Sequence, residues 1–154
     1  MLVVVRHAHA GKKAQWAGPD AQRPLSAKGR RQALSLAASL RNRDISTVWS
    51  SPTARCRQTV EPLASERHLP IRNLELLLPD ADVTALSALL AQPSMAGAVL
   101  CTHGETLARL LPLWRNAAPP DNLGDGGTAK GAAWLVDDLA RAQPTLRYVP
   151  AAPG

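Results

Sequence analysis

The sequence contains few aromatic residues, few cysteines and no long apolar run. Only 3% of its 154 residues are aromatic: one tyrosine, four tryptophans and no phenylalanine. Because proteins that bind single-stranded nucleic acid stack the bases on aromatic side chains, we rank nucleic acid below small anions as a partner. The longest apolar runs are far shorter than the roughly 20 residues that span a membrane, and Arg6 follows the first run too closely for a signal peptide. We therefore expect a cytoplasmic protein without a membrane partner.

The two cysteines, Cys56 and Cys101, lie far apart in the sequence and have no CxxC or zinc-ligand spacing. This excludes a disulfide framework and a cysteine-based zinc site, and it predicts reduced thiols that pack as small apolar side chains.

Positive charge is unevenly distributed along the chain. Residues 1–70 contain twelve Lys and Arg and four Asp and Glu, a net charge of +8, whereas residues 71–154 contain six and eight, a net charge of −2. Such a field attracts anionic ligands, although it does not by itself distinguish one class of anion from another. We expect a small anion or a phosphoprotein as the partner.

Apolar strand patterns alternate with helical patterns, with no linker, repeat or low-complexity tract. With 45% hydrophobic and 19% charged residues, this alternation predicts one α/β domain over residues 1–154, a mostly parallel sheet with helices on both faces. The expected strands are 2–5, 47–50, 71–77, 98–102, 132–136 and 146–149. The expected helices are 27–41, one opened by Ser51-Pro52 and kinked or split at Pro62, one capped by Asp82 and running to 90, and 105–114. A glycine-rich loop is expected over 124–127.

Three of these strands lead directly into charged or polar side chains. The first ends in Arg6 and His7, the second leads through Ser51-Pro52 to Arg55, and the fourth ends at His103. Ligands of open α/β sheets bind beyond the carboxyl ends of the strands, so these four side chains are expected to share a pocket. Arg55 falls in the first turn of a helix, where unpaired N–H groups and the helix dipole also favour an anion. The combination predicts a pocket for a phosphoryl group.

Three segments resemble the histidine phosphatase superfamily, whose fold is called phosphoglycerate-mutase-like. Arg6-His7-Ala8 is similar to its Arg-His-Gly signature, with alanine in place of the usual glycine. The segment 50–59, with the pattern SSPxxRxxQT, is similar to its second phosphate-binding segment, and Thr102-His103-Gly104 is similar to its second histidine. The segment 23–33, RPLSxxGxxQA, is typical of its first helix entry. The short chain and the opening RHAxA are most similar to the small SixA-like phosphohistidine phosphatases and to domains fused to Nudix hydrolases. The resemblance implies a three-layer α/β/α sandwich.

The resemblance also implies roles for the predicted site. His7 would attack phosphorus and form a phosphohistidine that water hydrolyses, which suits an imidazole because its ordinary pKa of about 6.5 leaves it mostly neutral at pH 7. Arg6, Arg55 and His103 would bind the phosphoryl oxygens and neutralise their charge. No metal or other cofactor is implied. The chain is too short for the insertions of the mutases, so a mutase activity is not expected.

The proton donor to the leaving group is less clearly indicated. Relatives that cleave alcohol phosphates carry an acidic residue beyond the third strand, and Asp80 is the nearest match, with Glu75 as the runner-up. Asp80 is equally explained as a turn residue. Because an imidazole leaving group departs with little proton assistance, a phosphohistidine phosphatase needs no such acid. Whether the site contains an acid therefore depends on the substrate, which is either a phosphorylated small molecule or a phosphohistidine protein.

Two other functional classes are a metalloenzyme and a non-catalytic phosphate-binding module. A metal site could use His7, His9 and His103, but no carboxylate accompanies the first pair and the arginines would repel the ion. A non-catalytic phosphate-binding module would keep the pocket without turnover. The presence of all four central residues favours an enzyme.

Overall fold

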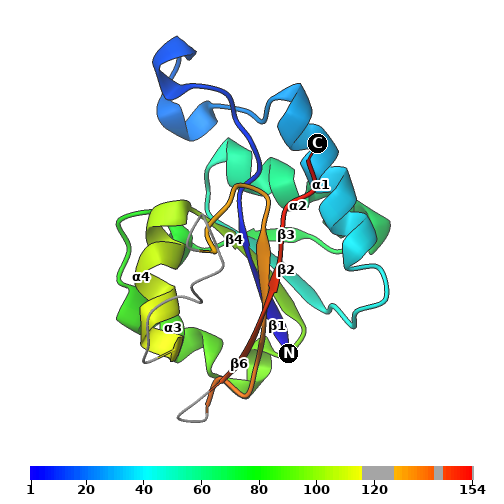
Figure 1. Ribbon diagram of the computed structural model, residues 1–154, viewed down its shortest axis with the longest axis vertical. Helices are drawn as coiled ribbons and strands as arrows, with labels where there is room; N and C mark the ends of the chain where they lie inside the picture. Colours follow the sequence, from blue (N-terminus) through cyan, green and yellow to red (C-terminus); the bar gives the residue numbers. More distant parts are fainter. Residues whose placement is uncertain (116–126, 141–143, 154) are drawn as a thin grey trace.

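The fold is a six-stranded mixed sheet covered by helices on both faces (Figure 1). The computed structural model describes residues 1–115, 127–140 and 144–153, so most of the glycine-rich stretch expected at 124–127 lies outside the described residues. The strand order is β3-β2-β4-β1-β5-β6. The strands are β1 (Leu2–Arg6), β2 (Thr47–Ser50), β3 (Ile71–Asn73), β4 (Ala98–Thr102), β5 (Ala133–Asp137) and β6 (Thr145–Val149).

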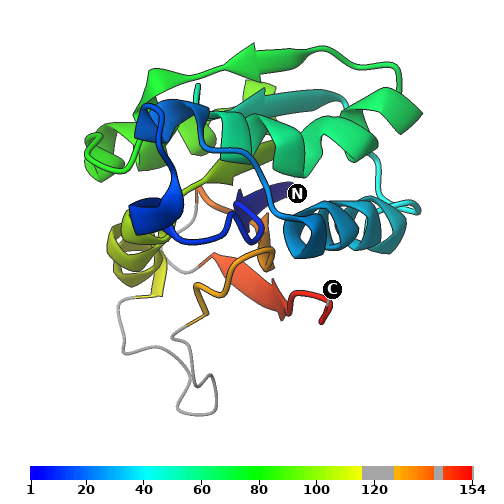
Figure 2. The ribbon, with the colours of Figure 1, turned by 90° about the horizontal axis from the view of Figure 1, so that it is seen from above.

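The strands β3, β2, β4 and β1 run parallel to one another, whereas β5 pairs antiparallel with both β1 and β6. The register aligns Arg6 with Thr102 and Ser50 with Cys101, so β1, β4 and β2 end at nearly the same level. The residues that follow them therefore emerge together at one edge. The segment between β1 and α1 lies over this edge (blue, Figures 1 and 2).

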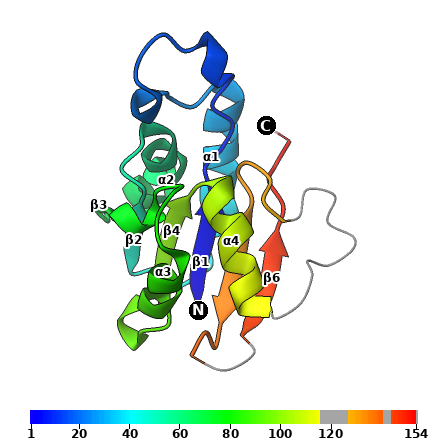
Figure 3. The same ribbon diagram turned by 90° about the vertical axis from the view of Figure 1, so that its left-hand side faces the viewer.

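The helices form two layers, which confirms the predicted sandwich. They are α1 (Ala27–Ser39), α2 (Ala54–Glu66), α3 (Val83–Leu90) and α4 (Gly104–Arg115). Along β1, Val3 and Val5 pack in the core shared with α1 and α2, while Leu2 and Val4 pack against α3 and α4, which cover the face seen in Figure 3. A strand buried on both faces reads as a continuous apolar run, which explains the LVVV sequence. No helix in the described ranges is long and apolar enough to span a membrane.

Two helix starts match the predicted capping residues. The Ser26 side chain accepts a hydrogen bond from Gly29 N, and the Asp82 carboxylate accepts from Thr84 N and Ala85 N. The start of α2 differs, because its N-cap is Thr53 rather than Ser51 and its first residue is Ala54. Arg55 nevertheless falls in the first turn, as predicted.

The larger remaining differences from the predictions concern α1, α2 and β3. The helix α1 ends at Ser39, two residues early. The helix α2 continues through Pro62 to Glu66 without splitting. The third strand ends at Asn73 instead of Leu77, because β2, its sheet neighbour among the described strands, ends at Ser50. The chain then turns through a 3-10 segment, Glu75–Leu77.

Candidate active site

The carboxyl ends of β1 and β4 bring the two predicted histidines together. His7 N donates a hydrogen bond to Thr102 O at 2.9 Å, and the rings of His7 and His103 lie edge to face, with 5.4 Å between their centroids. Both side chains are buried. The strand-end argument therefore correctly placed both histidines at one site.

The surroundings of His7 determine both its tautomer and its charge. Its Nδ1 lies 2.8 Å from Ala8 O, and since a carbonyl oxygen only accepts, Nδ1 carries the proton and Nε2 carries the free lone pair. Burial lowers the pKa of His7 from 6.5 to about 3; the Ala8 hydrogen bond opposes this shift, while the charges of His103, Arg55 and Arg6 add to it. The ring is thus a neutral nucleophile well below pH 7.

Buried side chains contact the ring of His103 on one side. Its Nε2 lies 3.0 Å from Ser51 Oγ and 3.6 Å from Cys56 Sγ, and both partners are fully buried. Ser51 Oγ also accepts a hydrogen bond from Thr53 N. Ser51 was predicted as a helix cap, and its contact with the second histidine was missed. Cys56 and Cys101 are free, buried thiols, as predicted.

Arg55 is held with one N–H group unused. Its NH1 donates to Asp20 O at 2.8 Å and its NH2 contacts Asp20 Oδ2 at 3.1 Å, whereas its buried Nε has no partner among the described residues. Asp20 also accepts from Arg23 Nε at 3.0 Å. Burial raises the pKa of Asp20, but the Arg23 hydrogen bond and the charges of Arg55, Arg23 and Lys13 outweigh it and the net shift is downward. A buried guanidinium N–H without a partner is suited to an incoming oxyanion.

Arg6 packs against the start of α4. Its NH1 donates to Thr128 O at 2.5 Å, in the turn that precedes β5. A Cβ atom placed on Gly104 would lie 2.7 Å from Arg6 Cζ, so the absence of a side chain at Gly104 makes room for the guanidinium. The Thr-His-Gly motif thus contributes a histidine and the space for an arginine.

The segment that leaves His7 is fixed to both helices of one layer. Ala8 N donates to Thr59 Oγ1 of α2, and His9 N donates to Gln32 Oε1 of α1, each at 2.9 Å. A Cβ on Gly29 would lie 1.9 Å from His9 O, so only glycine permits this close approach. These contacts make the predicted helix-entry motif a support for the site.

Asp80 and Glu75 are both exposed, and neither side chain forms a hydrogen bond or an ion pair within the described ranges. The chain that carries them does lie beside the second histidine, because Thr102 Oγ1 donates to Leu77 O at 2.6 Å and Thr106 Oγ1 donates to Leu78 O at 3.1 Å. The acid role of Asp80 stays a prediction. The described residues contain no group of three or more His, Cys, Asp or Glu side chains that could hold a metal.

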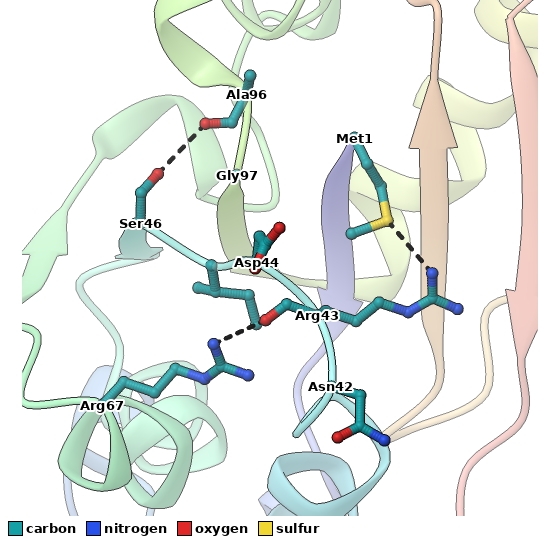
Figure 4. A pocket seen from close by; sticks show the side chains of 9 residues that line it. Met1, Asn42, Arg43, Asp44, Ser46, Arg67, Ala96 and Gly97 are labelled. Atoms are coloured by element: carbon teal, nitrogen blue, oxygen red, sulfur yellow. Dashed lines mark hydrogen bonds between the residues drawn. The ribbon is translucent and has the colours of Figure 1, made fainter.

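A pocket of about 650 Å³ lies at the opposite edge of the sheet, where the strands begin (Figure 4). Arg67 at this pocket donates to the carbonyls of Leu40, Arg41 and Arg43, and so caps the end of α1. This cationic group serves the fold, and the pocket is separate from the two histidines.

Comparison with known proteins agrees with these observations. Residues 2–78 match the histidine phosphatase superfamily, branch 1. The chain belongs to this superfamily. The 8-oxo-(d)GTP phosphatase of Mycolicibacterium smegmatis is 34% identical over 142 residues, which are 88% of this chain and 43% of that protein. The chain thus spans less than half of this relative.

Solved structures share the fold over nearly the whole chain. A protein histidine phosphatase SixA complexed with tungstate has a TM-score of 0.79 and 24% identity, covering 99% of this chain and 96% of the other. A candidate phosphohistidine phosphatase SixA from Nakamurella multipartitia has a TM-score of 0.71 and 27% identity, covering 97% of this chain and 95% of the other. The chain therefore has the SixA-like, phosphoglycerate-mutase-like fold.

Proposed function

We propose that residues 1–154 form one phosphatase domain that hydrolyses a phosphomonoester or phosphoramidate through a phosphohistidine on His7. The observation that supports it best is the pair of buried histidines whose ring centroids lie 5.4 Å apart, with the Nε2 lone pair of neutral His7 left free by the Nδ1 hydrogen bond to Ala8 O. In this proposal Arg6, Arg55 and His103 bind the phosphoryl group and no metal takes part. The cytoplasm remains the predicted location.

The reaction has two displacement steps. In the first, His7 Nε2 forms a bond to phosphorus as the bond to the leaving group breaks, and the hydrogen bond from Nδ1–H to Ala8 O stabilises the cationic ring. The guanidinium groups neutralise the phosphoryl oxygens, which otherwise repel the nucleophile. In the second step water attacks phosphorus, the N–P bond breaks and His7 returns to its neutral form.

The proposal is tested by trapping the phosphoenzyme. Wild-type protein is mixed with radiolabelled acetyl phosphate or another reactive phosphate and quenched in alkaline detergent, because the N–P bond is acid-labile. We expect one labelled site that is absent in His7→Asn and present in His68→Asn, which makes the same change at an exposed histidine. Phosphate binding without a labelled protein or turnover would instead identify a non-catalytic module.

The substrate class has two candidates. The SixA-like fold supports a phosphohistidine protein, whose imidazole leaving group needs no acid, and this agrees with the exposed position of Asp80. The Mycolicibacterium smegmatis relative supports a nucleotide. A panel of a phosphoramidate, p-nitrophenyl phosphate, nucleotides and sugar phosphates separates the two by the ratio of kcat/KM values.

A further inference from the structure

Two lysines near the candidate active site have no partner of opposite charge among the described residues. Lys28 is the second residue of α1 and is exposed, and Lys130 is half-buried in the turn before β5. Within the ranges that the structure describes, neither ammonium group forms a hydrogen bond or an ion pair. Their charge is therefore available to a ligand.

The turn that carries Lys130 is attached to the active-site strand. Thr128 O accepts the hydrogen bond from Arg6 NH1, and Gly131 N donates to the carbonyl oxygens of Arg6 and His7, each at 3.1 Å. Lys130 lies between these two anchored residues. Its position is thus tied directly to the nucleophile.

The start of α1 carries Lys28 to the same region. Ser26 N donates to His9 O at 3.0 Å, and Ser26 Oγ lies 2.6 Å from His9 Nδ1. Lys28 follows Ser26 by two residues. Both lysines therefore lie within two residues of a residue that is hydrogen-bonded to the segment 6–9.

The electrostatics of neighbouring groups agree with this placement. Burial lowers the pKa of Lys130, and the charges of Arg6, Arg23 and Lys28 lower it further. Burial also lowers the pKa of His9, and the charges of Lys130 and Lys28 lower it further. Like charges are thus gathered next to the phosphoryl site, which costs free energy in the absence of an anion.

The positive charge here exceeds what one phosphoryl group neutralises. The Asp20 carboxylate is shared between Arg55 and Arg23. Among the described residues of this region, Lys28 and Lys130 add two more positive charges, so these four cations and one carboxylate carry a net charge of +3. A phosphoryl dianion offsets about two of these charges.

Building on the proposed phosphatase function, we propose that Lys28 and Lys130 form a second anion subsite. The substrate class is a phosphoanhydride such as a nucleoside diphosphate: its terminal phosphoryl group is transferred to His7, and the next phosphoryl group is bound between the two lysines.

This substrate class also suits the chemistry of the site. As His7 Nε2 bonds to the terminal phosphorus, the bridging P–O bond breaks and its electron pair stays on the leaving phosphate, near the two ammonium groups. A phosphate monoester has a second pKa of about 6, so it departs without a proton from a general acid. Water then displaces His7, and its two protons leave with the inorganic phosphate or pass to solvent.

The test compares kcat/KM for ADP and for p-nitrophenyl phosphate, which has a single phosphoryl group. We expect the wild type to prefer ADP. Replacing both lysines (Lys28→Gln with Lys130→Gln) should lower kcat/KM for ADP about tenfold, as for two partly exposed charge contacts, and change that for p-nitrophenyl phosphate less than about threefold. The control Arg30→Gln with Arg31→Gln removes two exposed charges from the same helix and should change both values less than about threefold.

Inhibition gives a second measurement that does not require turnover of ADP. Pyrophosphate should inhibit p-nitrophenyl phosphate hydrolysis at a lower concentration than phosphate does, and the double lysine variant should lose this difference. Equal losses for both substrates, a control as damaging as the lysine variant, or equal inhibition by the two anions would overturn the proposal. If His7→Asn still abolishes p-nitrophenyl phosphate hydrolysis in that case, the phosphatase function stands; if the wild type hydrolyses nothing, both proposals fail.

Discussion

The low pKa of His7 makes a quantitative prediction about acid stability. The group titrates at about 3 in the folded protein and at about 6.5 in the unfolded chain, so between these pH values the unfolded state binds more protons. Linkage through His7 therefore lowers the free energy of unfolding as the pH falls below 6.5. Above pH 6.5 this loss disappears. The cause is burial of a ring that would have to accept a positive charge beside other cations.

The size of the effect follows from the two pKa values. Between pH 7 and pH 5, linkage through His7 alone lowers the free energy of unfolding by about 2 kcal/mol. For a chain of 154 residues this corresponds to a decrease in Tm of about 4 to 8 °C. The variant His7→Gln lacks the titrating group and should not show this part of the decrease.

Urea unfolding of both proteins at pH 7 and pH 5 measures the difference directly, because other titrating groups contribute equally to both. NMR titration of the His7 ring should show it neutral at pH 5. Equal losses of stability in the two proteins, or a His7 ring that titrates near pH 6.5, would refute the reasoning.

Three further predictions concern single contacts of the site. Ser51→Ala removes the hydroxyl 3.0 Å from His103 Nε2 and should lower kcat by about 10- to 100-fold. Ser51→Thr keeps a hydroxyl and should recover part of the activity. Equal kcat values for the alanine variant and the wild type would contradict a role of Ser51 in positioning His103. Gly104→Ala places a Cβ 2.7 Å from Arg6 Cζ, so the inhibition constant of phosphate should rise about tenfold with little change in Tm, and unchanged inhibition would show that Arg6 does not bind the anion. Asp80→Asn should slow only substrates with poor leaving groups if Asp80 is the acid, and equal rates across a leaving-group series would remove it from that role.

The positions of the central residues of the candidate site could be predicted from the sequence because they depend on local structure. Arg6, His7 and His103 follow apolar strands, and parallel strands end at one edge, so residue type and strand end were sufficient. Arg55 follows from the first turn of a helix in the same way. The fold class and the two helical layers were predictable from the alternation of strands and helices.

The supporting contacts were not predictable, since they depend on the path of irregular segments. Asp20 contacts Arg55 across 35 residues of sequence, and it lies in a 3-10 turn (Asp20–Gln22) whose position no periodicity indicates. The Ser-Pro pair predicts a helix cap at Ser51, because it is typical of helix starts. In the structure the Ser51 hydroxyl contacts His103 and the helix begins three residues later. Both residues act through side-chain contacts that only the tertiary structure creates.

The causes of the low His7 pKa also bear on the state of the nucleophile in the complex. The charges of His103, Arg55 and Arg6 oppose protonation of His7 in the free protein, but a bound phosphoryl dianion would largely cancel them. Burial, the largest cause, does not depend on those charges, and the substrate removes further water from the ring. Burial therefore keeps Nε2 free to attack at the moment when the cations are occupied by phosphate. A site that relied on neighbouring charge alone would favour protonation of its nucleophile on binding the substrate.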